Sequence, residues 1–212
     1  MPIGSPLKIA VLLSGSGRTL QNLIDLRAAG HLDIDVQTVI ASRPDLGGSE
    51  KAIRAQLAHH VVDRKAFPDL HEFSTRVFAL CDEAGVDLVV LAGWLSLLIL
   101  PDRYRGRVMN IHPSLLPSFG GKGMYGRKVH QAVIDAGCKV SGCTVHFVDA
   151  TYDTGPIVLQ RTCPVYEDDT ADALAARVFE EEKIALPEAI RLYQQGRIQI
   201  KGRRVNVVKL PS

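Results

Sequence analysis

The chain has 212 residues, of which 46% are hydrophobic and 23% are charged, and its formal net charge is +2. This length and composition are those of an ordinary globular enzyme with one full core or two small ones. The small net charge argues against a nucleic-acid-binding protein.

The ends of the chain and its apolar runs show no targeting or membrane signal. The N-terminus lacks the charged and apolar regions of a signal peptide. The longest apolar run, residues 89–100, is interrupted by Gly93 and Ser96 and is too short to span a bilayer. We therefore expect a cytoplasmic protein with no membrane partner.

The four cysteines have no Cys-x-x-Cys spacing and the histidines no His-x-x-x-His spacing, so we expect buried thiols and no metal.

The first ninety residues alternate between apolar runs and amphipathic segments. The apolar runs predict strands at residues 7–13, 35–41, 60–62 and 88–92, and a helix is expected after each of the first three. The third helix is predicted to run from a cap at Asp69, with Glu72 three residues on, to about Ala84. This alternation predicts an α/β fold, a doubly wound and Rossmann-like sheet that is mainly parallel.

A glycine-rich turn, residues 14–19, joins the first strand to the first helix. Glycines allow the backbone to approach an anion, and free N–H groups at a helix N-terminus bind it. Gly15 and Gly17 are not followed by a glycine at position 20, and the Gly-Lys-Ser/Thr of a P-loop is absent, so neither a dinucleotide fingerprint nor a P-loop is complete. We interpret the turn as a site for a single phosphate, and a simple tight turn is the alternative.

The second half predicts an antiparallel C-terminal extension of the sheet. A strand ends at residues 108–111, a short helix is expected at 129–136, and strands at 139–148 and 157–165 could pair antiparallel. A long helix follows, capped by Asp169 or Thr170, kinked at Pro187 and ended by Gly196. A hairpin about Gly202 is expected at 198–208. No linker or internal repeat is present, so we predict a single domain over residues 1–212.

Asn110 and His112 form the best candidate for a catalytic pair. They are two residues apart at the carboxyl end of a buried strand, so both side chains should point to the same side, where open α/β sheets bind ligands. Asp153, in a later turn-rich loop, could pair with the imidazole, and the Asn110 amide could donate to an oxyanion. These groups suit direct acyl transfer. Ser114 is a rival nucleophile, but its flanking prolines and the lack of a Gly-x-Ser-x-Gly elbow favour a structural role.

The string Asn-Ile-His-Pro-Ser-Leu-Leu-Pro at residues 110–117 resembles the signature of the folate-dependent formyltransferases. That family includes the glycinamide ribonucleotide and the methionyl-tRNA formyltransferases. Further similarity lies in residues 14–17, 20–25, 89–94, 142–148 and 153–156, so the resemblance covers most of the chain. It implies one formyltransferase domain whose N-terminal half is the phosphate or nucleotide side and whose C-terminal half is the folate side.

The resemblance also implies an activity and a set of site residues. The formyl group of the co-substrate 10-formyltetrahydrofolate would pass to the amine of glycinamide ribonucleotide, in de novo purine biosynthesis, through a tetrahedral intermediate. The implied catalytic set is Asn110, His112 and Asp153. The implied folate contacts are Trp94, Leu95, Leu97, Leu98, Val148, Asp149, Ala150, Thr151 and Tyr152, and the implied substrate contacts are Gly17, Arg18, Thr19 and Glu182. The implied partners are these small molecules; a homodimer is left open.

The sequence departs from the family pattern in three places. The family usually has Ser-Asn where this chain has Arg18-Thr19, Leu70 falls near the family's phosphate-side arginine, and residues 120–126 are unusually rich in glycine. Taken alone, Trp94 and the leucines after it fit a core as well as a ligand pocket. Two other functions also stay open: a formyltetrahydrofolate hydrolase, and a non-catalytic nucleotide-binding module that uses only the glycine-rich turn.

Overall fold

The computed structural model describes residues 5–209, so the first residues of the N-terminal segment in which no signal peptide is expected lie outside it. In chain order its helices and strands are β1 (Leu7–Leu13), α1 (Arg18–Ala28), β2 (Ile34–Ala41), α2 (Gly47–Arg54), β3 (His59–Val61), η1 (Arg64–Ala66), α3 (Leu70–Glu83), β4 (Leu88–Leu91), η2 (Asp102–Tyr104), β5 (Val108–His112), α4 (Arg127–Asp135), β6 (Val140–Phe147), β7 (Ile157–Pro164), α5 (Ala171–Gln194), β8 (Ile198–Lys201) and β9 (Arg204–Val207).

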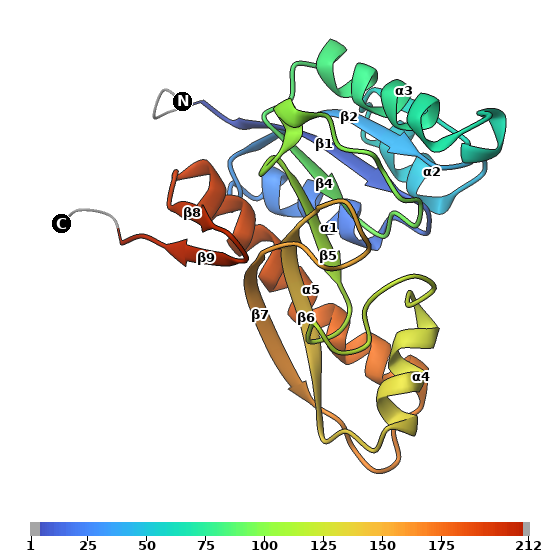
Figure 1. Ribbon diagram of the computed structural model, residues 1–212, viewed down its shortest axis with the longest axis vertical. Coiled ribbons are helices and arrows are strands. Elements are labelled where there is room, and N and C mark those ends of the chain that lie inside the picture. Colours follow the sequence, from blue (N-terminus) through green and yellow to red (C-terminus); the bar gives the residue numbers. More distant parts are fainter. Residues whose placement is uncertain (1–4, 210–212) are drawn as a thin grey trace. The chain divides into compact units, whose positions relative to one another are not determined.

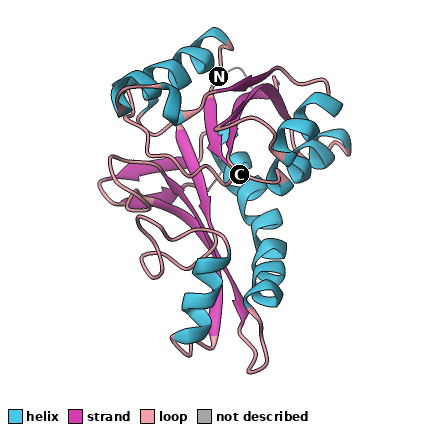
Figure 2. Ribbon diagram, turned by 90° about the vertical axis from the view of Figure 1, so that its right-hand side faces the viewer, coloured by secondary structure: helices cyan, strands magenta, loops and turns pink. Residues whose placement is uncertain are grey.

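The strands are hydrogen-bonded in the order β3-β2-β1-β4-β5-β6-β7, and β8 pairs with β9 in a separate sheet (Figure 1). β1 is parallel to β2 and β4, and β2 is parallel to β3, whereas β6 and β7 are antiparallel. Helices accompany these strands (Figure 2). The predicted α/β fold with a mainly parallel sheet and an antiparallel C-terminal extension is confirmed.

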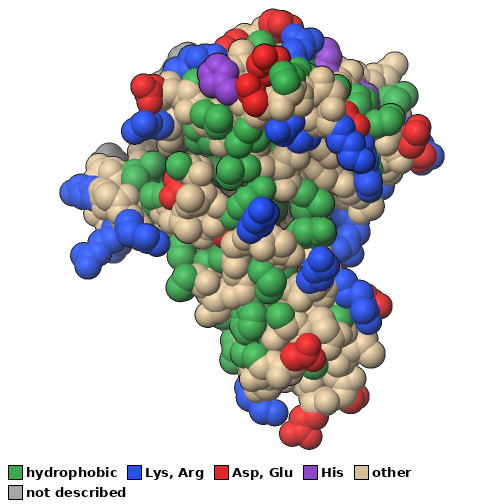
Figure 3. All heavy atoms as spheres, turned by 45° about the vertical axis from the view of Figure 1, so that its right-hand side comes forward, with side chains coloured by type: hydrophobic (Ala, Val, Ile, Leu, Met, Phe, Trp, Pro, Cys, Tyr) green, Lys and Arg blue, Asp and Glu red, His purple; other side chains and the backbone are tan. Residues whose placement is uncertain are grey.

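By its internal contacts the chain divides into two compact units, one ending at Met109 and one beginning at Asn110. The prediction of a single domain over residues 1–212 stays a prediction. Both acidic and basic side chains are present on the face shown in Figure 3, and over the whole sequence their charges nearly cancel, with a net charge of +2. None of the helices in the described part of the chain is both long and apolar enough to cross a bilayer.

The first unit follows the predicted alternation closely. β1 has the predicted bounds and lies between β2 and β4, and every residue of it except Lys8 is buried, as in a central strand of a parallel sheet whose two faces are covered. The predicted cap of α3 is confirmed, since the Asp69 side chain accepts a hydrogen bond of 2.8 Å from the Glu72 N–H. β3 lies one residue earlier than predicted: its ladder to β2 ends at Val61, and the buried Val62 follows the strand.

The second unit is built on the antiparallel pair β6 and β7, against which α5 packs (Figure 1). Thr170 caps α5 by accepting from the Ala173 N–H at 3.1 Å, while Asp169 forms an ion pair with Arg177. Of the two predicted caps, Thr170 is therefore the one that caps the helix. Pro187 lies within α5, which continues to Gln194. The predicted C-terminal hairpin is present as β8 and β9, with Gly202 in its turn at φ 58°.

The cysteines differ in exposure. Cys81, Cys143 and Cys163 are buried free thiols, as expected, but Cys138 is partly exposed because it follows the end of α4 in a surface turn. Burial raises the pKa of the Cys81 and Cys143 thiols to about 12, so they are inert at neutral pH.

Candidate active site

β5 holds the predicted catalytic pair on one side of the strand. Asn110 Nδ2 donates to Asp153 Oδ1 at 3.5 Å, and His112 Nδ1 lies 3.5 Å from Asp153 Oδ2. Because both side chains reach the same carboxylate, they point to the same side, as their spacing predicts. The intervening Ile111 is buried at 6% exposure, which anchors the strand from its other face. In the predicted catalytic set, Asn110 and His112 thus each contact Asp153 within the second unit.

The Asp153 loop is shaped by close backbone approaches. Asp153 itself has φ 57°, in the left-handed region that few non-glycine residues adopt. Two residues on, a Cβ at Gly155 would lie 1.8 Å from the Phe147 carbonyl oxygen, so only glycine fits there. Farther back in the loop, Asp149 Oδ1 accepts from the Thr151 N–H at 3.2 Å and from the Thr154 hydroxyl at 2.7 Å. These contacts fix the turn that presents the carboxylate.

The glycine-rich segment, residues 120–126, contacts the same carboxylate. The Gly121 N–H donates to Asp153 Oδ2 at 2.9 Å. A Cβ at Gly120 would lie 2.5 Å from a Leu116 methyl group and 3.2 Å from Asp153 Cβ. Gly121 itself has φ 98°, a conformation that favours glycine, which explains part of this segment's departure from the family pattern.

His146 is a fourth member of the cluster that sequence reasoning missed. It is 2% exposed, and its Nε2 lies 3.1 Å from Asn110 Nδ2 and 3.6 Å from Asp153 Oδ1. Its Nδ1 lies 2.9 Å from the Phe147 carbonyl oxygen. Since a carbonyl only accepts, Nδ1 carries the hydrogen, and Nε2 of the neutral ring accepts from the Asn110 amide. The strand predicted at residues 139–148 was the available signal, because the side chains of a strand alternate and this places His146 on one of its two sides.

The His112 ring is held from both of its nitrogens. Nε2 lies 2.9 Å from the carbonyl oxygen of Phe119 and so carries a hydrogen that it donates. Nδ1 faces the Asp153 carboxylate, to which a protonated ring would also donate. His112 is only 4% exposed, so a charge on the ring would depend on Asp153 rather than on water.

Burial and charge set the protonation states of this pair. Burial lowers the pKa of His112 and the His146 ring acts in the same direction, although the Asp153 carboxylate and the Phe119 carbonyl oppose them. Burial alone would raise the pKa of Asp153, but the two histidine rings and the Gly121 N–H hold it below its ordinary value. At neutral pH the free protein therefore has a neutral His112 and an ionised Asp153. The expected upward influence of Asp153 on His112 is present but is outweighed by burial.

Ser114 has the structural role that its surroundings predict. It is fully buried, and its hydroxyl donates to the Ser118 carbonyl at 2.7 Å. Its own carbonyl accepts from the Thr144 hydroxyl at 2.6 Å, and Thr144 Oγ1 accepts in turn from the Leu116 N–H at 3.0 Å. This network holds the segment after His112 against β6. The Ser114 hydroxyl is buried and hydrogen-bonded within it, so it is not accessible to a substrate.

In the first unit, the glycine-rich turn lies beside the segment that follows β4. The Leu95 N–H donates to Ser14 Oγ at 3.1 Å, and the Ser14 N–H donates to the Gly93 carbonyl at 3.0 Å. α1 starts at Arg18, directly after Gly17 at φ 71°, so Arg18 and Thr19 lie in its first turn as predicted. Leu70, at the expected place of the family's arginine, opens α3.

The side chains predicted to contact folate differ in exposure. Trp94 is 7% exposed and stacks on Phe73 with ring centroids 5.9 Å apart, and Leu98 is 2% exposed, so both contribute to the core. Leu95 is 42% exposed and Leu97 partly exposed. In the second unit, Val148, Asp149 and Tyr152 are partly exposed, Ala150 and Thr151 are exposed, and together they form the segment directly before Asp153. Glu182 is half-buried in α5, near enough to Cys143 of β6 for its charge to add to the effect of burial on that thiol's pKa.

The described residues contain no group of three or more His, Cys, Asp or Glu side chains arranged to hold a metal ion. What converges instead is an amide donor, two imidazoles and a carboxylate at the end of a strand. These are the groups of an enzyme that transfers an acyl group by stabilising an oxyanion and moving protons.

Comparison with known proteins agrees with this class. Residues 7–190 match the formyl transferase family, so the chain belongs to that family. It is 37% identical to the phosphoribosylglycinamide formyltransferase of Haemophilus influenzae, over 92% of this chain and 90% of that protein. It is also 37% identical to the trifunctional purine biosynthetic protein adenosine-3 of Gallus gallus, of which it spans only 19%.

Solved structures are similar over nearly the whole chain. The glycinamide ribonucleotide transformylase 1 of Symbiobacterium toebii has a TM-score of 0.90 and 41% identity, covering 97% of this chain and 96% of that one. A formyltetrahydrofolate deformylase from Pseudomonas syringae pv. tomato has a TM-score of 0.84 and 25% identity, covering 97% of this chain and 67% of that one. The hydrolase is the more distant in sequence of these two.

Proposed function

We propose that the chain transfers the formyl group of 10-formyltetrahydrofolate to the amine of glycinamide ribonucleotide, a step of de novo purine biosynthesis. The observation that carries this proposal is the contact of Asn110 and His112 with one buried carboxylate, Asp153, within a formyl transferase fold. Similarity to proteins named phosphoribosylglycinamide formyltransferase supports this choice of acceptor. The reaction needs no metal.

The proposed reaction is a direct acyl transfer. The substrate amine attacks the formyl carbon, a new C–N bond forms, and the formyl oxygen becomes an oxyanion. Asn110 donates to that oxygen the amide hydrogen that otherwise faces Asp153 Oδ1 at 3.5 Å, and such a donor is worth on the order of a hundredfold in rate. The bond between the formyl carbon and folate N10 then breaks, and N10 takes up a proton in place of the one that the attacking amine loses.

His112 and Asp153 handle the proton and the charge. His112 is neutral before the reaction because burial lowers its pKa. Negative charge developing on the oxyanion favours the imidazolium, so His112 takes up the proton that the attacking amine loses as the tetrahedral intermediate forms, and gives it up when N10 is protonated. Asp153 is ionised throughout, because its pKa is held low, and it stabilises the imidazolium from the Nδ1 side. His146 fixes the Asn110 amide by accepting one of its hydrogens.

The binding residues follow from the same proposal. The phosphate binds at the N-terminus of α1 through Gly17, Arg18 and Thr19, and Arg18 adds a positive charge that the usual Ser-Asn pair lacks. Glu182 binds the ribose hydroxyls. Folate contacts Trp94, Leu95, Leu97, Leu98, Val148, Asp149, Ala150, Thr151 and Tyr152.

Residues 1–212 work as one formyltransferase domain in the cytoplasm, with small-molecule partners, no nucleic acid or membrane, and a homodimer as a further state to test.

Two other functions are distinguished by one assay. A formyltetrahydrofolate hydrolase would release folate product without an amine acceptor, and the similarity to the deformylase makes this the second candidate. A nucleotide-binding module would release none. Tetrahydrofolate formation is therefore measured with and without glycinamide ribonucleotide. The proposal requires product only with the ribonucleotide, together with the formylated ribonucleotide in equal amount; equal release without it would overturn the proposal.

A further inference from the structure

The glycine-rich turn of the first unit is held by the helix α2. The Gly48 N–H donates to the Gly15 carbonyl at 3.1 Å, and the Lys51 ammonium donates to the Ser16 carbonyl at 2.9 Å. A Cβ at Gly17 would lie 2.5 Å from the Cα of Gly48, so the two backbones touch. Lys51 is the one side chain in this set of contacts, and no part of the proposed chemistry accounts for it.

The Lys51 contact determines where the next backbone N–H points. In a planar trans peptide, the carbonyl of one residue and the N–H of the following residue point in opposite directions. A Ser16 carbonyl held toward Lys51 therefore directs the Gly17 N–H to the opposite side of the turn. Gly17 precedes the first residue of α1, where N–H groups are available to an anion.

This peptide needs a restraint because Gly17 is glycine. Rotation of the Ser16–Gly17 peptide changes φ of Gly17, and glycine accepts positive and negative φ with little cost. Without the hydrogen bond to Lys51, the peptide could turn its carbonyl toward the anion and lose one N–H donor. The hydrogen bond between Gly48 and Gly15 would keep the turn in its position, but the Ser16–Gly17 peptide would no longer be held in one orientation.

We propose that Lys51 is a positioning residue for substrate phosphate: its hydrogen bond to the Ser16 carbonyl keeps the Gly17 N–H directed at the phosphate. This inference rests on the proposed function, in which Gly17, Arg18 and Thr19 bind that group. In this proposal the Lys51 ammonium lies on the side of the Ser16–Gly17 peptide opposite the phosphate. It therefore affects phosphate binding by orienting the peptide and not by contacting the phosphate.

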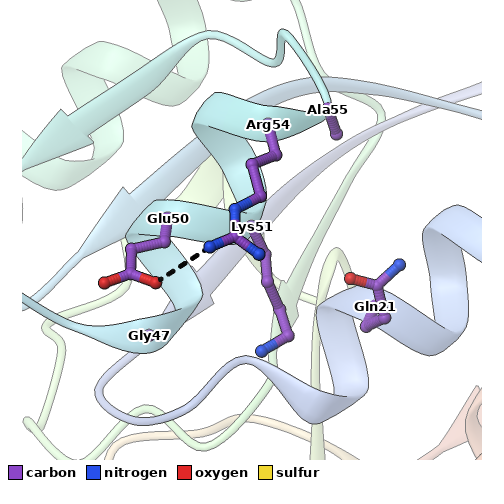
Figure 4. A pocket seen from close by; sticks show the side chains of 6 residues that line it. All are labelled: Gln21, Gly47, Glu50, Lys51, Arg54 and Ala55. Carbon is purple, nitrogen blue, oxygen red and sulfur yellow. Dashed lines mark ion pairs between the residues drawn. The ribbon is translucent and has the colours of Figure 1, made fainter.

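The surroundings of Lys51 supply a matched control. Lys51 lines a pocket between α1 and α2 together with Gln21, Gly47, Glu50, Arg54 and Ala55 (Figure 4). Arg54, on the same helix, lies 3.7 Å from Glu50 and is 80% exposed. Figure 4 shows the Lys51 side chain extending toward the turn before α1, whereas the Arg54 guanidinium lies against Glu50. Arg54→Met removes the same charge from the same pocket and leaves the Ser16 carbonyl held.

Steady-state kinetics test the proposal on Lys51→Met, Lys51→Arg and Arg54→Met. A lost hydrogen bond from a charged donor corresponds to about tenfold in binding. We expect Lys51→Met to raise the KM for glycinamide ribonucleotide about tenfold, with kcat and the KM for folate nearly unchanged. Lys51→Arg keeps donors in place and should recover most of the loss, and Arg54→Met should stay within about twofold of wild type. An unchanged KM in Lys51→Met, or an equal rise in Arg54→Met, would overturn the proposal.

A second measurement needs no catalysis. Inorganic phosphate is titrated into ¹⁵N-labelled protein, and the amide signal of Gly17 is followed. Wild type should show a saturable shift of that signal, and Lys51→Met should require a higher phosphate concentration while keeping its melting temperature. If wild type transfers no formyl group but Gly17 still responds through Lys51, the proposed function fails and the positioning role stands. If transfer is normal and Gly17 responds alike in both proteins, the positioning role fails.

Discussion

Asp153→Asn isolates the charge of the carboxylate at the centre of the cluster. The substitution keeps the size and shape of the side chain, and an amide oxygen can still accept the 2.9 Å hydrogen bond from the Gly121 N–H. What it removes is the negative charge facing His112 Nδ1 at 3.5 Å and His146 Nε2 at 3.6 Å. That charge opposes the effect of burial on the pKa of His112, so the pKa of His112 should fall further in the variant.

The expected kinetic effect is large, and the structural effect is small. A positioned acid–base group contributes on the order of a hundredfold or more in rate, or about 2.7 kcal/mol of barrier. We therefore expect kcat to fall at least about a hundredfold, because the imidazolium formed during the reaction loses its counter-charge. The fold should be retained, since the hydrogen bond to the loop is kept and a buried charge is removed.

The variant has a charge-matched control in the same unit. Asp172→Asn removes one carboxylate from the first turn of α5, where Asp172 is 79% exposed and pairs with Arg127, and its rate should equal that of wild type. Formyl transfer and melting temperature are measured on the same preparations. A folded Asp153→Asn within about threefold of wild type would remove Asp153 from the mechanism, and equal losses in both variants would indicate a general effect of charge.

The remaining predictions concern the other proposed site residues. Asn110→Ala and His112→Ala should each lower kcat about a hundredfold, and the double variant should lose clearly less than the product of the two, because both stabilise one oxyanion, Asn110 by a hydrogen bond and His112 by the charge of its imidazolium; strict additivity in free energy would refute the shared oxyanion. Arg18→Ala should raise the KM for glycinamide ribonucleotide more than it lowers kcat, because its contact is made in the ground and transition states alike; a fall in kcat with unchanged KM would give the turn another role. The lowered pKa of His112 means that the unfolded chain binds its proton first, so its contribution to stability is complete above pH 6.5 and is lost as the pH falls through the folded-state pKa. The melting temperature of wild type should therefore drop more steeply from pH 7 to 5 than that of His112→Asn, and parallel curves would contradict this reasoning.

Local sequence patterns were sufficient for most of the fold. The apolar run of β1 and the Asp69–Glu72 cap of α3 depend on contacts within a few residues, and the structure has both where they were predicted. The spacing of Asn110 and His112 likewise placed both side chains on one side of β5, because the alternation of a strand is a local property. Element ends were less certain: α4 starts at Arg127, two residues before the predicted start, since Gly126 already marks its beginning.

The assembly of the site depended on contacts between distant parts of the chain. Asp153 lies 43 residues from Asn110, His146 lies 36, and Lys51 lies 35 from Ser16, and no periodicity joins such positions. The pairing of β6 and β7 beside His146 is also irregular, because the register shifts between Val145 and His146, and such a shift arises only when the strands meet.

The protonation state of His112 likewise required the tertiary structure. A nearby carboxylate predicts a raised pKa, whereas the burial of the ring, at 4% exposure, lowers it, and only the packed structure decides which effect is larger. The sequence by itself determined which groups the chain carries and the local geometry of each. Tertiary structure decided which of these groups contact one another and how exposed each is to solvent. Both properties depend on loop closure and on packing against segments far away in the chain.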